Sequence, residues 1–100
     1  MDPLDELRGC IGFDWDDANA HKIWEKHGVS RGEAEQVFFN SPLVVVDDSE
    51  HSDQELRYFA LGQTNRSRLL FTVFTIRNQF VRVISARDMT KNERAAYRSS

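Results

Sequence analysis

The chain has 100 residues, of which 40% are hydrophobic, 29% charged and 11% aromatic, and its formal net charge is −3. This length suits one domain, and the composition argues against a disordered or fibrous chain. No apolar run approaches the ~20 residues of a membrane-spanning helix, and the single cysteine, Cys10, cannot form an internal disulfide. We therefore exclude a membrane protein and a disulfide scaffold. We also expect no metal site, no cofactor and no secretion signal, and hence a cytoplasmic protein.

The chain begins with a segment that shows no hydrophobic period. We expect residues 1–12 to form a flexible lead-in and residues 13–100 to form a single domain. Either Asp16 or Asp17 can cap a first helix over residues 18–27, which ends at Gly28. Apolar residues recur at helical spacing within this segment, so the helix is expected to bury one face.

A second helix and four strands are predicted next along the chain. The spacing of Ser30 and Glu33 is that of a capping box and predicts a helix that ends near Pro42. Beyond this proline, β-branched and apolar residues predict strands over residues 43–46, 56–61, 68–76 and 80–85. A tight hairpin over residues 77–79 joins the last two of these strands.

A second capping box, from Thr90 to Glu93, predicts a short C-terminal helix that runs through Tyr97. The expected order is therefore two helices, four strands and one helix. Strands joined by short turns favour an antiparallel meander that helices cover on at least one face. The sequence predicts an α+β fold with two N-terminal helices, a four-stranded antiparallel sheet and a short C-terminal helix.

The charges are distributed unevenly between the two halves of the chain. Residues 1–55 contain four Lys and Arg against fourteen Asp and Glu, a balance of −10, whereas residues 56–100 contain nine against two, a balance of +7. Eight of the nine cations in the second half are arginines, whose planar guanidinium binds phosphate through two hydrogen bonds. This asymmetry favours a face that binds a polyanion. The alternative is a solvated surface whose two halves neutralise each other.

Several separated motifs have the residues and spacing of a known family. They are FDWD at 13–16, EKHGVS at 25–30, HSDQELR at 51–57, GQT at 62–64 and VRVISARDM at 81–89. In these motifs the chain resembles the BrnT family, and the resemblance covers residues 13–97. One departure lies in the first predicted helix, where many relatives carry Lys at the position of Asn19 and Asn at that of Ile23.

The resemblance to the BrnT family implies a function as well as a fold. It implies a RelE-like toxin of a type II toxin–antitoxin system, with ribonuclease activity that blocks translation. It also implies RNA as the substrate and a DNA-binding antitoxin of the BrnA kind, through which the complex binds operator DNA. A dimer and a heterotetramer with the antitoxin both stay open, and no membrane partner is expected.

Cleaving RNA without a metal requires three kinds of chemical group. A base takes the proton of the 2′-OH, an acid protonates the leaving 5′-oxygen, and cations stabilise the charge on phosphorus. The segment 51–57 holds all three kinds in His51, Glu55 and Arg57. His51 titrates near neutrality and can serve as acid or base, while Glu55 is the alternative base or orients His51. The structural alternatives are an exposed loop histidine without a function and a surface ion pair between Glu55 and Arg57.

Two further arginines are predicted to stabilise the charge of the transition state. Arg82 alternates with valines in its predicted strand, so it points away from their face and meets either a carboxylate of the protein or a phosphate. Arg87 follows that strand and either lies beside the substrate or pairs with Asp88 or Glu93. We expect further contacts with RNA from Arg68, Arg77 and Tyr97. For the tyrosine, the structural alternative is to pin the terminal helix to the sheet.

Two classes of function remain open from the sequence. The first is an endoribonuclease toxin whose catalytic residues are His51, Glu55, Arg57, Arg82 and Arg87. The second is a non-catalytic module that binds its antitoxin and takes part in operon repression. The complete set of histidine, glutamate and arginines favours the enzyme.

Overall fold

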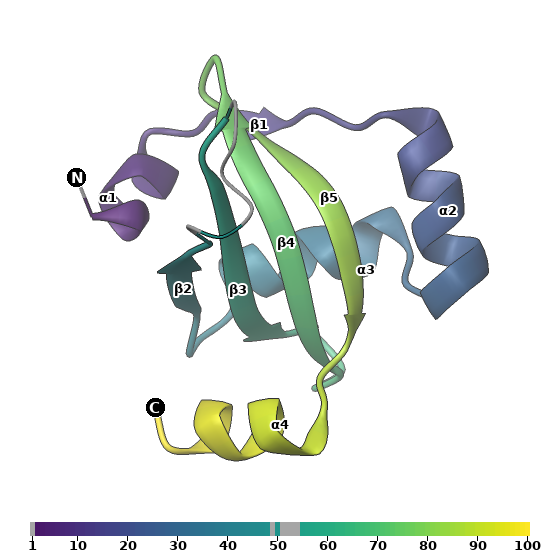
Figure 1. Cartoon of the computed structure of the whole chain (residues 1–100), viewed down its shortest axis with the longest axis vertical. Helices are drawn as coiled ribbons and strands as arrows, with labels where there is room; N and C mark the ends of the chain where they lie inside the picture. The colour runs from purple at the N-terminus through teal and green to yellow at the C-terminus, as the bar shows by residue number, and fades with distance from the viewer. Residues whose placement is uncertain (1, 49, 51–54) are drawn as a thin grey trace.

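The computed structural model describes residues 2–48, 50 and 55–100. Its elements are α1 (Pro3–Arg8), β1 (Gly12–Phe13), α2 (Asp17–His27), α3 (Arg31–Gln36), the 3-10 helix η1 (Val37–Phe39), β2 (Val44–Asp47), β3 (Arg57–Gln63), β4 (Leu69–Arg77), β5 (Phe80–Asp88) and α4 (Lys91–Arg98). The strands form one five-stranded sheet in the order β1-β5-β4-β3-β2 (Figure 1). Within the described residues, no helix has the length and apolar character needed to cross a membrane.

The expected four-stranded antiparallel sheet is wrong, because a fifth strand joins the sheet in parallel. Strand β1 pairs with β5 in parallel, whereas the other neighbouring strands are antiparallel. Backbone hydrogen bonds from Ile11 N to Gln79 O (2.8 Å) and from Asp14 N to Val81 O (2.9 Å) extend this pairing. A strand of two residues is too short to show the alternation by which a strand is identified in a sequence.

Helix α1 also departs from the expected order, which placed only two helices before the sheet. It lies within the segment that we expected to be a loose lead-in. Asp2 caps it by accepting a hydrogen bond from Leu4 N (3.0 Å), and Pro3 occupies the first turn, where its missing N–H costs nothing. The helix has only six residues, so no helical period was visible, but Leu7 and Cys10 in this region pack against the core.

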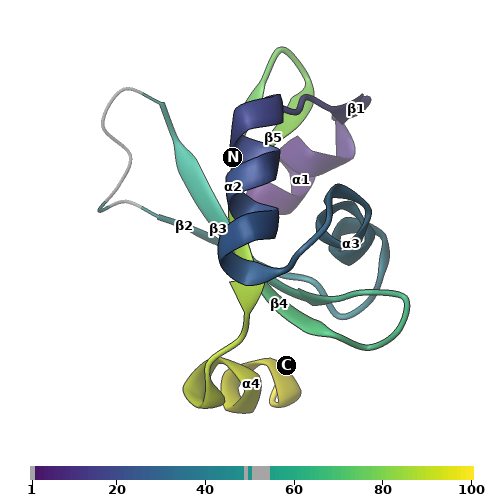
Figure 2. The same cartoon turned by 90° about the vertical axis from the view of Figure 1, so that its right-hand side faces the viewer.

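The predicted helix caps are confirmed. Helix α2 begins after Asp16, whose side chain accepts a hydrogen bond from Asn19 N (3.2 Å), and it ends at Gly28 in the left-handed conformation (φ 63°). Both capping boxes form as expected, at Ser30 with Glu33 and at Thr90 with Glu93. The caps fix where these helices begin and end. In the fold, α2 lies along the β5 side of the sheet and α4 across its end (Figures 1 and 2).

One face of the sheet carries the main core. Helices α1 and α3 lie on this side (Figure 2), where Leu70 and Phe74 of β4 are completely buried. The 3-10 helix approaches β3 so closely that a Cβ on Gly62 would lie 2.9 Å from the Cβ of Val37. Burying one large apolar side chain contributes about 1.5–3 kcal/mol. This face is therefore occupied by the packing that stabilises the fold.

The described residues cover the opposite face of the sheet only in part. Helix α4 packs across one end, where Leu61, Met89 and Tyr97 form a second buried cluster. Towards the β4–β5 hairpin no described helix crosses the strands, and α3 lies behind them (Figure 1). We call this surface of β3, β4 and β5 the open face, and its end at the hairpin the hairpin end.

Candidate active site

Three polar side chains form a row across the hairpin end of the open face. The strand register pairs Arg57 of β3 with Thr75 of β4, and Thr75 with Arg82 of β5. Directly opposed residues of antiparallel strands point to the same face, about 5 Å apart. As predicted, Arg82 points away from Val81 and Val83, which belong to the core. We call Arg57, Thr75 and Arg82 the arginine row.

Glu55 lies beside the arginine row and binds a further arginine. Its carboxylate accepts two hydrogen bonds from Arg77, one from Nε at 2.8 Å and one from Nη2 at 2.9 Å. The hydrogen bond from Arg77, followed by the charges of Arg77, Arg82 and Arg57, lowers the pKa of the Glu55 carboxyl. Glu55 is therefore an ionised hydrogen-bond acceptor at neutral pH, in the field of three arginines.

Arg82 meets a carboxylate of the protein, which is one of the two environments that the sequence left open. Its Nε lies 3.5 Å from Oδ2 of Asp14, the residue that follows β1. The side chain of Arg82 is 28% exposed and that of Asp14 is 55% exposed. Because exposed ion pairs contribute only about 0–1 kcal/mol, an anionic ligand can compete with Asp14 for this guanidinium.

Asn19 of α2 holds the strand that carries Arg82, a role that the sequence reasoning missed. The register of β4 and β5 shifts between Val73 and Phe74, so Ile84 is an extra residue on β5. The Asn19 side chain donates hydrogen bonds to the carbonyls of Val83 (2.8 Å) and Ile84 (3.0 Å) at this bulge. Bulges commonly re-aim neighbouring side chains. The only signal in the sequence is that position 19 departs from the residue typical of the family it resembles.

These groups surround a polar hollow of about 340 Å³. Its lining includes Asn19, Lys22, Glu55, Arg57, Thr75 and Arg82. The volume is at the lower end of the range for small-molecule sites, about 300–1,000 Å³. Across residues 2–48, 50 and 55–100, no group of three or more His, Cys, Asp or Glu is placed to hold a metal ion. The lining also includes the carboxylates of Asp14 and Asp16. The hollow therefore combines three cations that can bind an anion with three carboxylates, of which Glu55 is the one placed to accept a proton.

Arg87 lies at the other end of β5. Its partner on β4, Phe71, is four residues from Thr75, the partner of Arg82, so the two arginines lie about 13 Å apart along the sheet. Its Nη1 and Nη2 donate to the two carboxylate oxygens of Glu93 at 2.8 and 3.0 Å. The guanidinium also lies 4.2 Å from the ring centroid of Phe71, the residue opposite it on β4. The structure therefore separates Arg87 from the arginine row, and the ion pair with Glu93 considered for it is present.

The other predicted contacts are placed away from the hollow or lie outside the described residues. Arg68 donates to the carboxylates of Asp88 and Glu33 and to two backbone carbonyls at the end of α2. Tyr97 is 4% exposed and its hydroxyl donates to the Pro42 carbonyl at 2.6 Å, which pins α4 to the sheet. Arg77 alone of the three predicted RNA contacts lies at the hairpin end. His51 lies outside the described residues.

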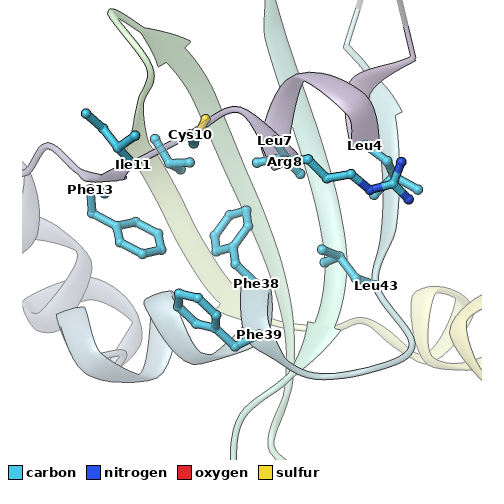
Figure 3. A pocket seen from close by; sticks show the side chains of 11 residues that line it. Leu4, Leu7, Arg8, Cys10, Ile11, Phe13, Phe38, Phe39 and Leu43 are labelled. Atoms are coloured by element: carbon cyan, nitrogen blue, oxygen red, sulfur yellow. The ribbon is translucent and has the colours of Figure 1, made fainter.

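A second pocket, of about 380 Å³, lies between α1, the chain around β1 and the 3-10 helix (Figure 3). Its lining is mostly apolar, and side chains such as Leu7, Phe13, Phe38 and Leu43 point into it. Among the described residues of this lining, Arg8 is the one that carries a charge. The pocket offers no pair of groups for acid–base chemistry within this part of the chain, so the polar hollow is the candidate active site.

Comparison with known proteins agrees with the resemblance seen in the sequence. The family model described as the ribonuclease toxin BrnT of type II toxin–antitoxin systems matches residues 15–93. The crystal structure of the Brucella abortus ribonuclease toxin BrnT has a TM-score of 0.63 to this chain at 19% identity, which shows a shared fold. The match covers 81% of this chain and 99% of that one. No curated protein matches. The chain belongs to the BrnT family of ribonuclease toxins of type II toxin–antitoxin systems.

Proposed function

We propose that this toxin is a metal-independent endoribonuclease whose active site is the polar hollow at the hairpin end. The observation that carries the proposal is that Glu55, Arg57 and Arg82 line one hollow. Sequence reasoning singled out these three residues for the same reaction. Arg57 and Arg82 lie far apart in the chain, and the strand register brings them to one row.

The chemistry that we propose uses the 2′-OH of RNA as the nucleophile. A base removes its proton, the oxygen attacks phosphorus, and the bond to the 5′-oxygen breaks as an acid protonates that leaving group. The products are a 2′,3′-cyclic phosphate and a free 5′-OH. Arg57 and Arg82 bind the non-bridging oxygens and stabilise the charge that develops on them.

Glu55 and His51 are both proposed for proton transfer. Glu55 is ionised and can accept a proton, and its hydrogen bonds to Arg77 hold it in place. The same hydrogen bonds lower the pKa of Glu55 and so make it a weaker base than a free carboxylate. His51 would then serve as the acid, or the two roles are exchanged. Cleavage measured against pH separates these assignments. The limb near the unperturbed histidine pKa of about 6.5 falls with rising pH if His51 is the acid and rises if His51 is the base, and it should be absent from His51→Ala and present in Glu55→Gln.

The proposal is tested by incubating purified total RNA with the wild-type chain and with Arg82→Ala, both in excess EDTA. Arg98→Ala is the matched control, because Arg98 is an exposed arginine in the last turn of α4. We expect the wild type and the control to cleave, leaving 5′-OH ends, and Arg82→Ala to lose activity with an unchanged circular dichroism spectrum. If folded wild type is inactive on free RNA, the assay is repeated on translating ribosomes. Inactivity there as well supports the non-catalytic binding module.

The family assignment implies a protein antitoxin, and we propose that it is a BrnA-like DNA-binding protein that carries the complex to operator DNA. The excess of acidic residues in positions 1–55 supports a basic partner surface. We further propose that the toxin acts in the cytoplasm by blocking translation. Copurification with the product of the neighbouring gene, followed by operator binding and a mass measurement, tests the partner and distinguishes a dimer from a heterotetramer.

A further inference from the structure

An apolar row lies next to the arginine row on the open face. The register pairs Val46 of β2 with Phe59 of β3, Phe59 with Val73 of β4, and Val73 with Ser85 of β5. Side chains of a strand alternate between faces, so on β3 and β4 these residues occupy the position next to the arginine row on the same face. On β5 the step from Arg82 to Ser85 is three residues because the bulge adds one. We call Val46, Phe59, Val73 and Ser85 the apolar shelf.

The apolar shelf is not part of either buried core. Val46 is 42% exposed, and Phe59 and Val73 are half-buried. Phe59 stacks on Phe71 of β4, with ring centroids 5.3 Å apart and an angle of 28° between the rings. Phe71, in turn, packs against the cluster beneath α4. Phe59 is therefore held in position from one side while part of it stays accessible to a ligand.

The two rows together fit the two parts of a nucleotide. Arg57 and Phe59 lie two residues apart on the same face of β3, about 7 Å along the strand. A phosphate bound to the arginine row thus leaves an adjoining base within reach of the shelf. Aromatic side chains next to cations are the usual means of binding single-stranded nucleic acid. Charge complementarity with the arginine row favours RNA over an apolar protein segment as the ligand.

We propose that the apolar shelf binds one nucleobase next to the scissile phosphate, with the base stacked on Phe59. This inference rests on the proposed function, because it takes the arginine row as the phosphate site. A base in a duplex is already stacked and paired, whereas a base in a single strand can be turned onto the shelf. The shelf therefore selects unpaired RNA.

The test uses a fluorescent single-stranded RNA hexamer of mixed sequence that carries 2′-O-methyl groups, which block attack on phosphorus. Fluorescence anisotropy measures its affinity for wild type, Phe59→Leu and Phe59→Tyr, with each nucleotide replaced in turn by an abasic one. Phe39→Leu is the matched control, since Phe39 is 78% exposed and lines the apolar pocket away from the shelf. Thermal unfolding confirms that each variant is folded.

For the wild type we expect one abasic position to weaken binding about fivefold or more, the factor that corresponds to one stacked base. Phe59→Leu should weaken binding of the intact hexamer by a similar factor. The affinity of this variant should not fall further when that nucleotide is made abasic. Phe59→Tyr, which keeps the ring, and the Phe39→Leu control should behave as the wild type does. Equal sensitivity of Phe59→Leu and wild type to the abasic nucleotide would overturn the inference.

Other outcomes separate this inference from the proposed function. If the wild type cleaves RNA but no abasic position matters, the base site is wrong while the active site stands. If it neither binds the hexamer nor cleaves RNA, either free or on translating ribosomes, the proposed function fails and the shelf proposal fails with it. If Phe59→Leu binds RNA normally but loses affinity for the antitoxin, the shelf is a protein contact instead.

Discussion

Arg82 at the hairpin end of the sheet differs from Arg68 and Arg87 at the opposite end in how its guanidinium is bound. At the hairpin end, Arg77 donates two hydrogen bonds to Glu55, whereas Arg82 forms a longer ion pair with Asp14, at 3.5 Å. At the opposite end, Arg68 donates to two carboxylates and two backbone carbonyls. Arg87 there shares two hydrogen bonds with Glu93.

The difference shows why arginine content alone does not identify a phosphate site. A guanidinium whose donors are already directed at carboxylates must lose those bonds before it can bind a phosphate. Charged hydrogen bonds contribute about 1.5–3 kcal/mol each, so the saturated network around Arg68 favours a structural role. The ion pair of Arg82 is longer, at 3.5 Å, and involves a single carboxylate among the described residues. It is therefore displaced at lower cost, and this favours the hairpin end as the proposed RNA site.

The largest expected effect is a difference in RNA cleavage between Arg82→Ala and Arg87→Ala. Arg82→Ala should lower kcat/KM for RNA cleavage about 100-fold or more, as the loss of a group that stabilises transition-state charge does. Arg87→Ala should lower it less than about tenfold and mainly through KM, because Arg87 can contact only a neighbouring phosphate. Steady-state kinetics on one fluorogenic RNA substrate measures both. Equal losses in kcat for the two variants would contradict the division between the ends of the sheet.

The next effect concerns the stability of the opposite end. Arg68→Ala should lower the free energy of unfolding by about 2 kcal/mol, because it removes charged hydrogen bonds and leaves Asp88 and Glu33 without this partner. Urea unfolding measures the change, with the exposed Arg66→Ala as control. Cleavage at a temperature where the variant is folded should be unchanged. A stable variant that cleaves poorly would instead place Arg68 in RNA binding, as the sequence first suggested.

Local patterns predicted the parts of the fold that depend on neighbouring residues. The two capping boxes and the Gly28 terminus require residues within a few positions of one another, and all three form as expected. Strand β1 was missed because its two residues are defined only by pairing with β5, which lies far along the chain. Helix α1 carried a start signal in Asp2 and Pro3, but it was too short to show a period.

In the candidate site, too, the sequence predicted what depends on neighbouring residues and missed what depends on distant ones. Alternation with valines was enough to direct Arg82 away from the core. Strand register brings Asp14 to Arg82 and Arg77 to Glu55. The composition of the chain does not encode that register. Asn19 contacts a bulge 64 residues away, so neither its partner nor the bulge was visible locally. The sequence thus indicated the kinds of group in the site better than their arrangement.

A smaller effect is expected from Asn19→Ala, which removes the hydrogen bonds to the two bulge carbonyls. The loss should be about 1 kcal/mol of stability, together with a several-fold fall in kcat if the bulge orients Arg82. Thermal unfolding and cleavage kinetics measure the two effects. Asn92→Ala, at an exposed position on α4, is the control. A loss of stability with unchanged kcat would show that Asn19 supports the fold without positioning the site.

The smallest expected effect is the pH dependence of the stability that the Arg87–Glu93 ion pair contributes at the end of the sheet opposite the hairpin. The hydrogen bonds from Arg87, together with one from the Thr90 backbone, lower the pKa of Glu93 in the folded chain. A carboxyl whose pKa is lower when folded stabilises the protein above its unfolded pKa, about 4.3, and loses that contribution as pH falls through the folded pKa. Glu93→Gln should therefore be less stable than wild type at pH 7, by under about 1 kcal/mol, and the difference should shrink below about pH 4. Thermal unfolding across the range of about pH 3–7 measures it, with Glu50→Gln at an exposed position as control. A difference that stays constant over this whole range would mean that Glu93 acts through packing rather than through its charge.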